Sequence, residues 1–127
     1  MQSEVGARTL MKRPTLKTHP NGTKEWSIGG RLHREDGPAI EYSNGAKAWY
    51  LHEECHREDG PAVEYASGDK EWFLNGKLHR EDGPAVERAD GTKRWYLNDK
   101  RFSKGEWFEQ LTEEQQERVL FNSEVMV

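Results

Sequence analysis

The sequence feature that most constrains the fold is an internal repeat with a period of 23 residues. LHREDGPA at residues 32–39 returns as CHREDGPA at 55–62 and as LHREDGPA at 78–85. Seven identical residues in phase three times do not arise by chance, and such self-similarity predicts an array of one structural unit. The full repeats span residues 26–48, 49–71 and 72–94, and half-repeats flank them at about 15–25 and 95–102.

Each repeat is typical of short strands separated by tight turns. Between the first and second HREDG segments, AIEY at 39–42 and KAWYL at 47–51 favour strands, and the SNGA between them is a turn of the Asn-Gly class. A second turn follows at 52–55, before the next HREDG segment. No helix of even ten residues fits between these turns. The predicted fold is mainly β, an elongated antiparallel array of β-hairpins.

The HREDG loops, at residues 33–37, 56–60 and 79–83, are expected to serve the fold. Each loop glycine precedes proline, which predicts a turn with a positive φ at the glycine. Aspartate is expected to bond nearby backbone N–H groups. We expect the histidine to bond a carbonyl of a neighbouring loop, and the arginine to pair with an acid of the next repeat.

Alternation along the predicted strands places Trp49 with Leu51, Trp72 with Leu74 and Trp95 with Leu97 on one face. Cys55 stands in phase with Leu32 and Leu78, which indicates a buried substitute for leucine and not a reactive thiol. The predicted structural core consists of Trp26, Trp49, Trp72, Trp95, Leu51, Leu74, Leu97 and Cys55.

A change of period after the last repeat predicts a short α-helical cap. Capping boxes begin at Ser103 and Thr112 and predict two short helices at about 104–110 and 113–121, or one bent helix. These helices are expected to cover the open sheet edge of the last repeat, and a docking helix for another protein is the alternative. The expected organisation is a flexible arm at 1–14, a β-repeat domain at 15–102, a helical cap at 103–121 and a tail at 122–127.

The composition is polar, with 33% hydrophobic and 33% charged residues, yet five Trp, four Tyr and four Phe argue against disorder. Residues 1–31 are net basic and the remainder is net acidic, which suits a basic partner better than nucleic acid. The single cysteine allows no intramolecular disulfide. No signal peptide or membrane span is apparent, so a cytoplasmic location is expected.

The unit W-[YF]-L-N-G-K-x-H, followed by a glycine and Y-x-x-G, resembles the MORN repeat over about residues 15–121. Its NGKLHREDGPAVE form is similar to MORN-like repeats of bacteriophage and giant-virus proteins. The chain departs from ordinary MORN units because Arg34, Glu35 and Asp36 intervene before the glycine. The resemblance implies a hairpin array that acts through protein contacts, sometimes by pairing with itself. The lipid binding suggested for MORN arrays is not expected, since anionic membranes repel an acidic surface.

A histidine followed by carboxylates is also a ligand pattern for a metal or an acid–base pair. Such sites gather different residues around one point, whereas this array spaces identical residues on the order of 10 Å apart. No nucleophile motif and no phosphate-cradling glycine motif is present. We therefore expect no enzyme activity, no cofactor and no metal. Direct nucleic-acid binding is also not expected, although lysines and arginines flank the tryptophans.

The expected function is a non-catalytic protein-binding module, a small phage-encoded inhibitor or adaptor in the host-cell cytoplasm. Its partner would be a host protein, for example a defence or nucleic-acid-handling complex that takes the acidic pairs for phosphates. The alternative is a structural scaffold that self-associates, for example as a homodimer. The candidate partner-binding residues are Arg34, Glu35, Asp36, Arg57, Glu58, Asp59, Arg80, Glu81, Asp82, Glu109, Glu113, Glu114 and Glu117.

Overall fold

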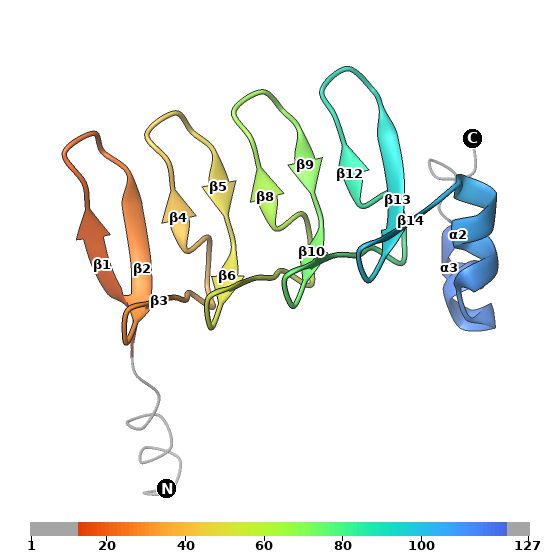
Figure 1. The fold of residues 1–127 in the computed structure, drawn as a ribbon, viewed down its shortest axis with the longest axis horizontal. Coiled ribbons are helices and arrows are strands. Elements are labelled where there is room, and N and C mark those ends of the chain that lie inside the picture. The colour runs from red at the N-terminus through yellow and green to blue at the C-terminus, as the bar shows by residue number, and fades with distance from the viewer. Residues whose placement is uncertain (1–12, 122–127) are drawn as a thin grey trace, which may run out of the picture.

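The computed structural model describes residues 13–121, and Figure 1 shows a row of β-hairpins closed at one end by two helices. This arrangement confirms the predicted mainly β fold, an elongated antiparallel hairpin array with a short helical cap. The predicted arm at 1–14, apart from its last two residues, lies outside the described residues. The predicted tail at 122–127 lies outside them as well.

Neighbouring hairpins pair edge to edge, so that ten of the described strands form one antiparallel main sheet. Its strands are β1 Thr15–Thr18, β2 Lys24–Ile28, β3 Arg31–Leu32, β4 Ile40–Glu41, β5 Lys47–Ala48, β8 Val63–Glu64, β9 Lys70–Glu71, β12 Val86–Glu87, β13 Lys93–Leu97 and β14 Lys100–Phe102. Their order in the sheet follows the chain, and β3 pairs with β2 beside this path. Each repeat therefore adds one hairpin to the sheet.

A second, shorter hairpin follows in each repeat, at the lower side of the array in Figure 1. Two of these form separate sheets, β6 Tyr50–Leu51 with β7 Glu54–Cys55 and β10 Phe73–Leu74 with β11 Lys77–Leu78. Their turn residues have positive φ, at His52 and Glu53 in the first and at Asn75 and Gly76 in the second. Positive φ at both positions favours Asn-Gly, so His52 and Glu53 occupy a backbone conformation that suits them poorly.

A row of alternating lysine and glutamate crosses the main sheet. Glu64 of β8 lies opposite Lys47 of β5 and Lys70 of β9, and the same pairing recurs in each repeat. Opposite charges across an antiparallel pair are favourable, so the row disfavours a slip of the register. The ion pairs within 4.0 Å that Glu41, Glu64 and Glu87 make are with the loop arginines. The row runs through Lys24, Glu41, Lys47, Glu64, Lys70, Glu87 and Lys93.

The core of the repeat region is thin and contains many small side chains. Ala39, Ala62 and Ala85, which end the HREDGPA segments, are completely buried. Their carbonyls accept hydrogen bonds from the backbone N–H groups of the tryptophans. Of the predicted core residues, Trp95 is buried and the others are half-buried. The half-buried ones are Trp26, Trp49, Trp72, Leu51, Leu74, Leu97 and Cys55.

The predicted cap consists of α2 Lys104–Gln110 and α3 Glu113–Phe121. Each helix begins with its predicted capping box. In the first box, the Ser103 hydroxyl accepts a hydrogen bond from the Glu106 N–H, and the Glu106 carboxylate accepts one from the Ser103 N–H. These reciprocal bonds fix the point at which the chain leaves the sheet and becomes helical.

The cap packs on the last hairpin of the array. Trp107 of α2 and Val119 of α3 are completely buried, and they form one apolar cluster with Trp95 of β13 and Leu111. The cap therefore covers the final repeat, in agreement with its predicted role as a lid.

Candidate protein-binding surface

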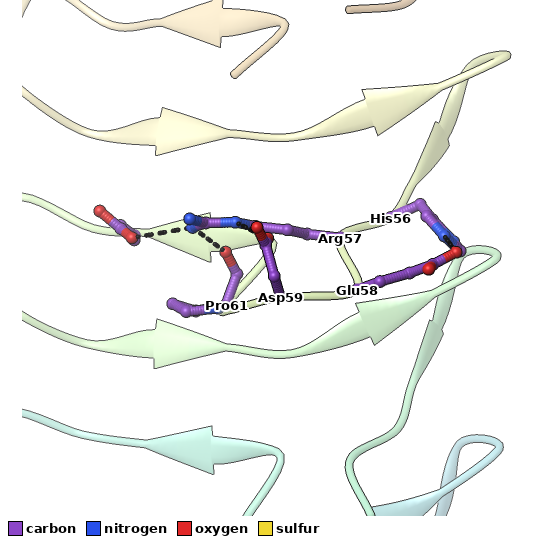
Figure 2. A network of polar contacts seen from close by, with 6 residues as sticks. His56, Arg57, Glu58, Asp59 and Pro61 are labelled. Atoms are coloured by element: carbon purple, nitrogen blue, oxygen red, sulfur yellow. Dashed lines mark hydrogen bonds and ion pairs between the residues drawn. The ribbon is translucent and has the colours of Figure 1, made fainter. Parts of the chain in front are cut away.

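In each HREDG loop the arginine folds back over the tryptophan of its own repeat. In the second loop, the guanidinium carbon of Arg57 lies 3.9 Å from the ring centroid of Trp49. Its Nε donates to Asp59 at 3.0 Å, and its Nη1 donates to the Pro61 carbonyl at 3.0 Å and to Glu64 at 3.3 Å (Figure 2). The loops of Arg34 and Arg80 repeat all of these contacts.

The arginine pairing predicted from the sequence was wrong in direction. Arg34, Arg57 and Arg80 each pair with acids of their own repeat and not with the next one. The aspartate likewise receives a hydrogen bond from this arginine, where a bond from the backbone was expected. The tryptophan ring explains the direction, because stacking on it draws the guanidinium back toward the preceding strand.

The loop glycines are required for space and not for an unusual backbone angle. The prediction of a positive φ was wrong, since Gly37, Gly60 and Gly83 are not among the described residues with positive φ. A Cβ atom at Gly60 would instead lie 2.9 Å from the guanidinium carbon of Arg57. The same distance is 3.0 Å at Gly37 and 2.7 Å at Gly83. The guanidinium is thus enclosed between an indole ring and a bare glycine.

The loop histidines connect one repeat to the next. His56 Nδ1 accepts a hydrogen bond of 2.8 Å from the backbone N–H of Asn75, in the following short hairpin. Its Nε2 lies 3.2 Å from Glu58, at the opposite end of the loop from the arginine contacts in Figure 2. An accepting Nδ1 places the proton on Nε2, so the ring is in one neutral tautomer. The expected carbonyl partner was wrong, because the neighbour supplies a donor.

His33 and His79 make the same connection, to the N–H groups of His52 and Asn98. All three side chains are largely covered, with exposed fractions of 5% at His33, 11% at His56 and 10% at His79.

The outer layer of the loops consists of carboxylates. Asp36 and Asp59 have side chains that are 87% exposed, whereas the side chains of Arg34 and Arg57 are only 21% and 23% exposed. The arginine side chains thus make their contacts inside the loop, whereas the carboxylates face solvent. The exposed acids of the three loops are Glu35, Asp36, Glu58, Asp59, Glu81 and Asp82.

Two clefts lie between successive loops. The first cleft, of about 620 Å³, has Trp49 and Leu51 among its lining, with the first and second loops around it. The second cleft, of about 410 Å³, has Trp72 and Leu74 in the same positions, one repeat further along. The common lining supports the prediction that Trp49 shares a face with Leu51, and Trp72 with Leu74. Each cleft combines an apolar patch with an acidic rim.

The remaining predicted binding residues lie on the cap. Glu109, Glu113, Glu114 and Glu117 are all exposed on α2 and α3. Arg118 of α3 reaches back to the second cleft and borders it. The sequence therefore indicated the acidic residues, but the placement of a basic side chain of the cap at a cleft was not predicted.

Cys55 carries no sign of a reactive thiol. Burial, and secondly the carboxylate of Glu71, raises the pKa of the Cys55 thiol to about 12. A thiol that keeps its proton is a poor nucleophile and a poor metal ligand. Within residues 13–121, no three His, Cys, Asp or Glu side chains are grouped as ligands for a metal.

No family model matches the chain, and comparisons with curated proteins and with solved structures gave no match. The likeness to MORN-like repeats therefore stays a prediction from the sequence. In the part of the chain that the structure describes, no helix has both the length and the hydropathy needed to cross a membrane.

Proposed function

We propose that this protein is a non-catalytic module that binds a protein partner through the exposed carboxylates of its HREDG loops. The observation that carries the proposal is the division of charge within each loop. Asp59 is 87% exposed while its ion-pair partner Arg57 is 23% exposed. An exposed ion pair contributes only about 0–1 kcal/mol, so the aspartate can accept a cation from a partner at little cost.

A row of such loops suits a partner with a basic surface. Complementary charge speeds encounter and selects the partner, while contacts in the clefts add affinity. Following the resemblance to viral repeat proteins, we expect the partner to be a host protein of an infected bacterium. With such a partner, we expect the protein to inhibit a defence complex or a nucleic-acid-handling complex of the host.

Affinity capture from bacterial lysate tests the proposal. The informative variant is Asp36→Asn/Asp59→Asn/Asp82→Asn, because the amide oxygen of asparagine still accepts the hydrogen bond from the arginine. The matched control is Glu54→Gln/Asp90→Asn/Asp99→Asn, which removes the same charge from the hairpins and leaves every carboxylate of the HREDG loops in place. We expect the wild type and the control to retain one host protein that the loop variant loses. Equal retention by all three forms, or none by any form, would sink the proposal.

Self-association is a second candidate, favoured by the β1 end of the array, which no helix of the described residues covers. All four residues of β1, Thr15–Thr18, are exposed, including Leu16 at 48%. An exposed edge strand is a template for pairing with another chain. Light scattering over a range of concentrations tests it: a dimer that Leu16→Lys weakens is expected, and a monomer at every concentration contradicts it.

A further inference from the structure

The third interval between repeats is filled by a side chain of the protein's own cap. Trp107 is completely buried, and its ring centroid lies 4.6 Å from that of Trp95. Its Nε1 donates a hydrogen bond of 2.8 Å to the carbonyl oxygen of Arg80. Leu97 and Phe102 pack against the same cluster. An indole with one N–H donor is therefore the occupant of this interval.

The sheet side of the surroundings of Trp107 recurs, one and two repeats earlier, around the two open clefts, whereas the contacts with Leu111 and Val119 of the cap do not. Trp95 and Leu97 stand in phase with Trp72 and Leu74, and Phe102 stands in phase with a histidine. Cover by the cap is visible in the third loop, where Gly83 and Pro84 are buried while their counterparts are half-buried. The equivalent cleft-lining sets are Arg34, Trp49, Leu51 and His56 in the first cleft, and Arg57, Trp72, Leu74 and His79 in the second.

One difference separates the filled interval from the open clefts. Ser103 stands where Arg57 and Arg80 stand in earlier repeats, so no guanidinium of residues 13–121 is stacked on Trp95 as one is on Trp49. In the open clefts an arginine covers part of the tryptophan ring, and the leucine and the loop backbone supply the remaining contact surface.

The hydrogen-bond acceptor that Trp107 uses is also repeated. No described group donates to the carbonyl oxygens of Arg34 and Arg57, which correspond to that of Arg80. The rims of the open clefts add Glu35, Asp36 and further acids, which favour a cation beside the ring.

We propose that the two open clefts bind tryptophan side chains of a basic partner segment, one ring in each cleft. The inference rests on the proposed function and names the chemistry of the partner. Each indole N–H would donate to the carbonyl of Arg34 or Arg57, as Trp107 does to that of Arg80. Lysine or arginine residues next to the tryptophans would meet the acidic rim.

The spacing of the clefts sets the spacing of the tryptophans. Each repeat adds two strands to the main sheet, so equivalent clefts lie about 10 Å apart. A polyproline II segment repeats every three residues and advances about 3.1 Å per residue, which places residues i and i+3 on one side and about 9.3 Å apart. A basic W-x-x-W segment in this conformation therefore fits both clefts at once.

Titration of the full-length protein with small probes, followed by NMR of the tryptophan side-chain N–H groups, tests the site. Tryptamine carries an indole donor and a cation, and 1-methyltryptamine lacks only the donor. We expect tryptamine to shift the signals of Trp49 and Trp72 but not that of Trp95, and the methylated probe to bind about fivefold more weakly. Arg118 borders the second cleft, so Trp49 should respond at the lower concentration.

Two peptides of equal composition test the spacing. The hexapeptide KWKPWK has its tryptophans three residues apart, and KKWWPK has them adjacent. We expect the first to bind at least tenfold more tightly, because occupying two clefts through one chain raises the effective concentration of the second ring. Equal affinity of the two peptides would overturn the two-cleft arrangement, and tryptamine without effect on Trp49 and Trp72 would overturn the indole site.

The loop variant Asp36→Asn/Asp59→Asn/Asp82→Asn separates this inference from the proposed function. The variant should bind tryptamine more weakly than the wild type and bind uncharged indole with unchanged affinity. Equal loss of affinity for both probes would contradict the role of the acidic rim. If both probes fail to bind wild-type protein while the loop variant still loses the captured host protein, the clefts are not indole sites and the acidic-loop function stands.

Discussion

At each HREDG loop, one arginine side chain holds the loop closed. Arg57 stacks on Trp49 and donates to the carbonyl of Pro61, and both contacts are partly shielded from water. A stacked guanidinium contributes about 0.5–2 kcal/mol, depending on desolvation, whereas an exposed ion pair such as that with Asp59 contributes about 0–1 kcal/mol. The stack and the carbonyl bond therefore stabilise the loop more than the ion pair with Asp59 does. The exposed carboxylate of Asp59 is free to contact a partner.

The close approach of this arginine to glycine gives the first prediction. Gly60→Ala places a methyl group 2.9 Å from the guanidinium carbon of Arg57, which must move off Trp49. We expect a loss of about 1–2 kcal/mol in the free energy of unfolding, measured in urea, because the stack and part of the hydrogen bonding are lost. Gly105→Ala is the control, since its Cβ meets nothing within 4 Å, and it should be at least as stable as the wild type because alanine favours the helix α2. If Gly60→Ala is also at least as stable as the wild type, the glycine is not required by the arginine.

The second prediction concerns Cys55 at alkaline pH. Burial, and then Glu71, raises the pKa of the folded thiol from 9.0 to about 12, so the unfolded chain releases this proton first. The stabilisation is complete below pH 9 and declines as the pH rises toward 12. We expect wild-type stability to fall faster between pH 9 and about 10.5 than that of Cys55→Leu, and loss of the thiolate also removes one of the charges that raise the pKa values of Tyr65 and Tyr50. Parallel curves for the two proteins would be evidence against this.

At the scale of elements, the short hairpins differ in how well their turns suit the residues. The β10–β11 turn has Asn75 and Gly76 at positive φ, but the β6–β7 turn has His52 and Glu53 there. A non-glycine residue in this region carries strain. The first hairpin keeps compensating contacts, because the Glu53 carboxylate accepts a hydrogen bond from the N–H of Leu32.

The third prediction is that the Asn-Gly sequence of the β10–β11 turn stabilises the protein when it replaces the residues of the β6–β7 turn. Replacing His52→Asn and Glu53→Gly together relieves the backbone strain but removes the bond to Leu32. We expect the free energy of unfolding, measured by heat or urea, to rise by about 0.5–1 kcal/mol, since the lost hydrogen bond is exposed. The single Glu53→Gln variant, which keeps an acceptor and the strain, should be close to neutral. A double variant less stable than the single one would show that the side-chain contacts outweigh the strain.

The fourth prediction concerns the cap. Trp107→Ala removes the largest completely buried side chain, and we expect a loss of about 3–5 kcal/mol. Trp107→Phe keeps an aromatic contact with Trp95 but leaves the carbonyl of Arg80 without its donor, at a cost of about 1–3 kcal/mol. Urea unfolding measures both, and Phe121→Ser, at a residue 91% exposed, is the control. A neutral Trp107→Ala variant would mean that the cap does not stabilise the array.

At the scale of the whole molecule, stability depends on contacts between neighbours. Each hairpin pairs with the next along the main sheet, and each loop histidine bonds the following short hairpin. In such an array the free energy of folding is approximately a sum of repeat and interface terms. The cap adds an interface of different chemistry at one end.

The fifth prediction is that the array tolerates loss of one whole repeat. Deleting residues 49–71 joins equivalent positions, so every remaining interface has its usual partner. We expect a folded protein with one cooperative transition, a lower urea midpoint and the same helical signal by circular dichroism. Deleting residues 60–71, about half a period, should abolish the folded state because Trp and loop positions no longer meet. The idea fails if both deletions behave alike.

The sequence predicted the array, the turns and both helices because each follows from local rules. Period-two alternation, Asn-Gly class turns and capping boxes act within a few residues, and the repeat showed them several times over. Internal contacts of the HREDG loop were not predicted correctly, since a long arginine side chain can reach either neighbouring strand. Stacking on Trp49 decides the direction, and that contact exists only after folding. The same contact, and not a positive φ, explains why glycine is required at position 60.

The sequence contains an indication of the role of Trp107, in a position that breaks the repeat. Tryptophan keeps its phase at position 95, but the arginine expected in phase at 103 is replaced by serine. A fourth ring without its guanidinium needs another cover, and a tryptophan follows only four residues later. Repeat positions that break the pattern therefore carry as much information as those that keep it.

The contact between Trp95 and Trp107 also gives the molecule an optical marker. Two indole rings with centroids 4.6 Å apart and planes inclined by 48° share their electronic excitation, which produces a paired positive and negative band in circular dichroism. Since one ring belongs to the sheet and the other to the cap, the paired band exists only while the two are docked. Detachment of the cap can therefore be followed in solution without a label, separately from unfolding of the hairpins.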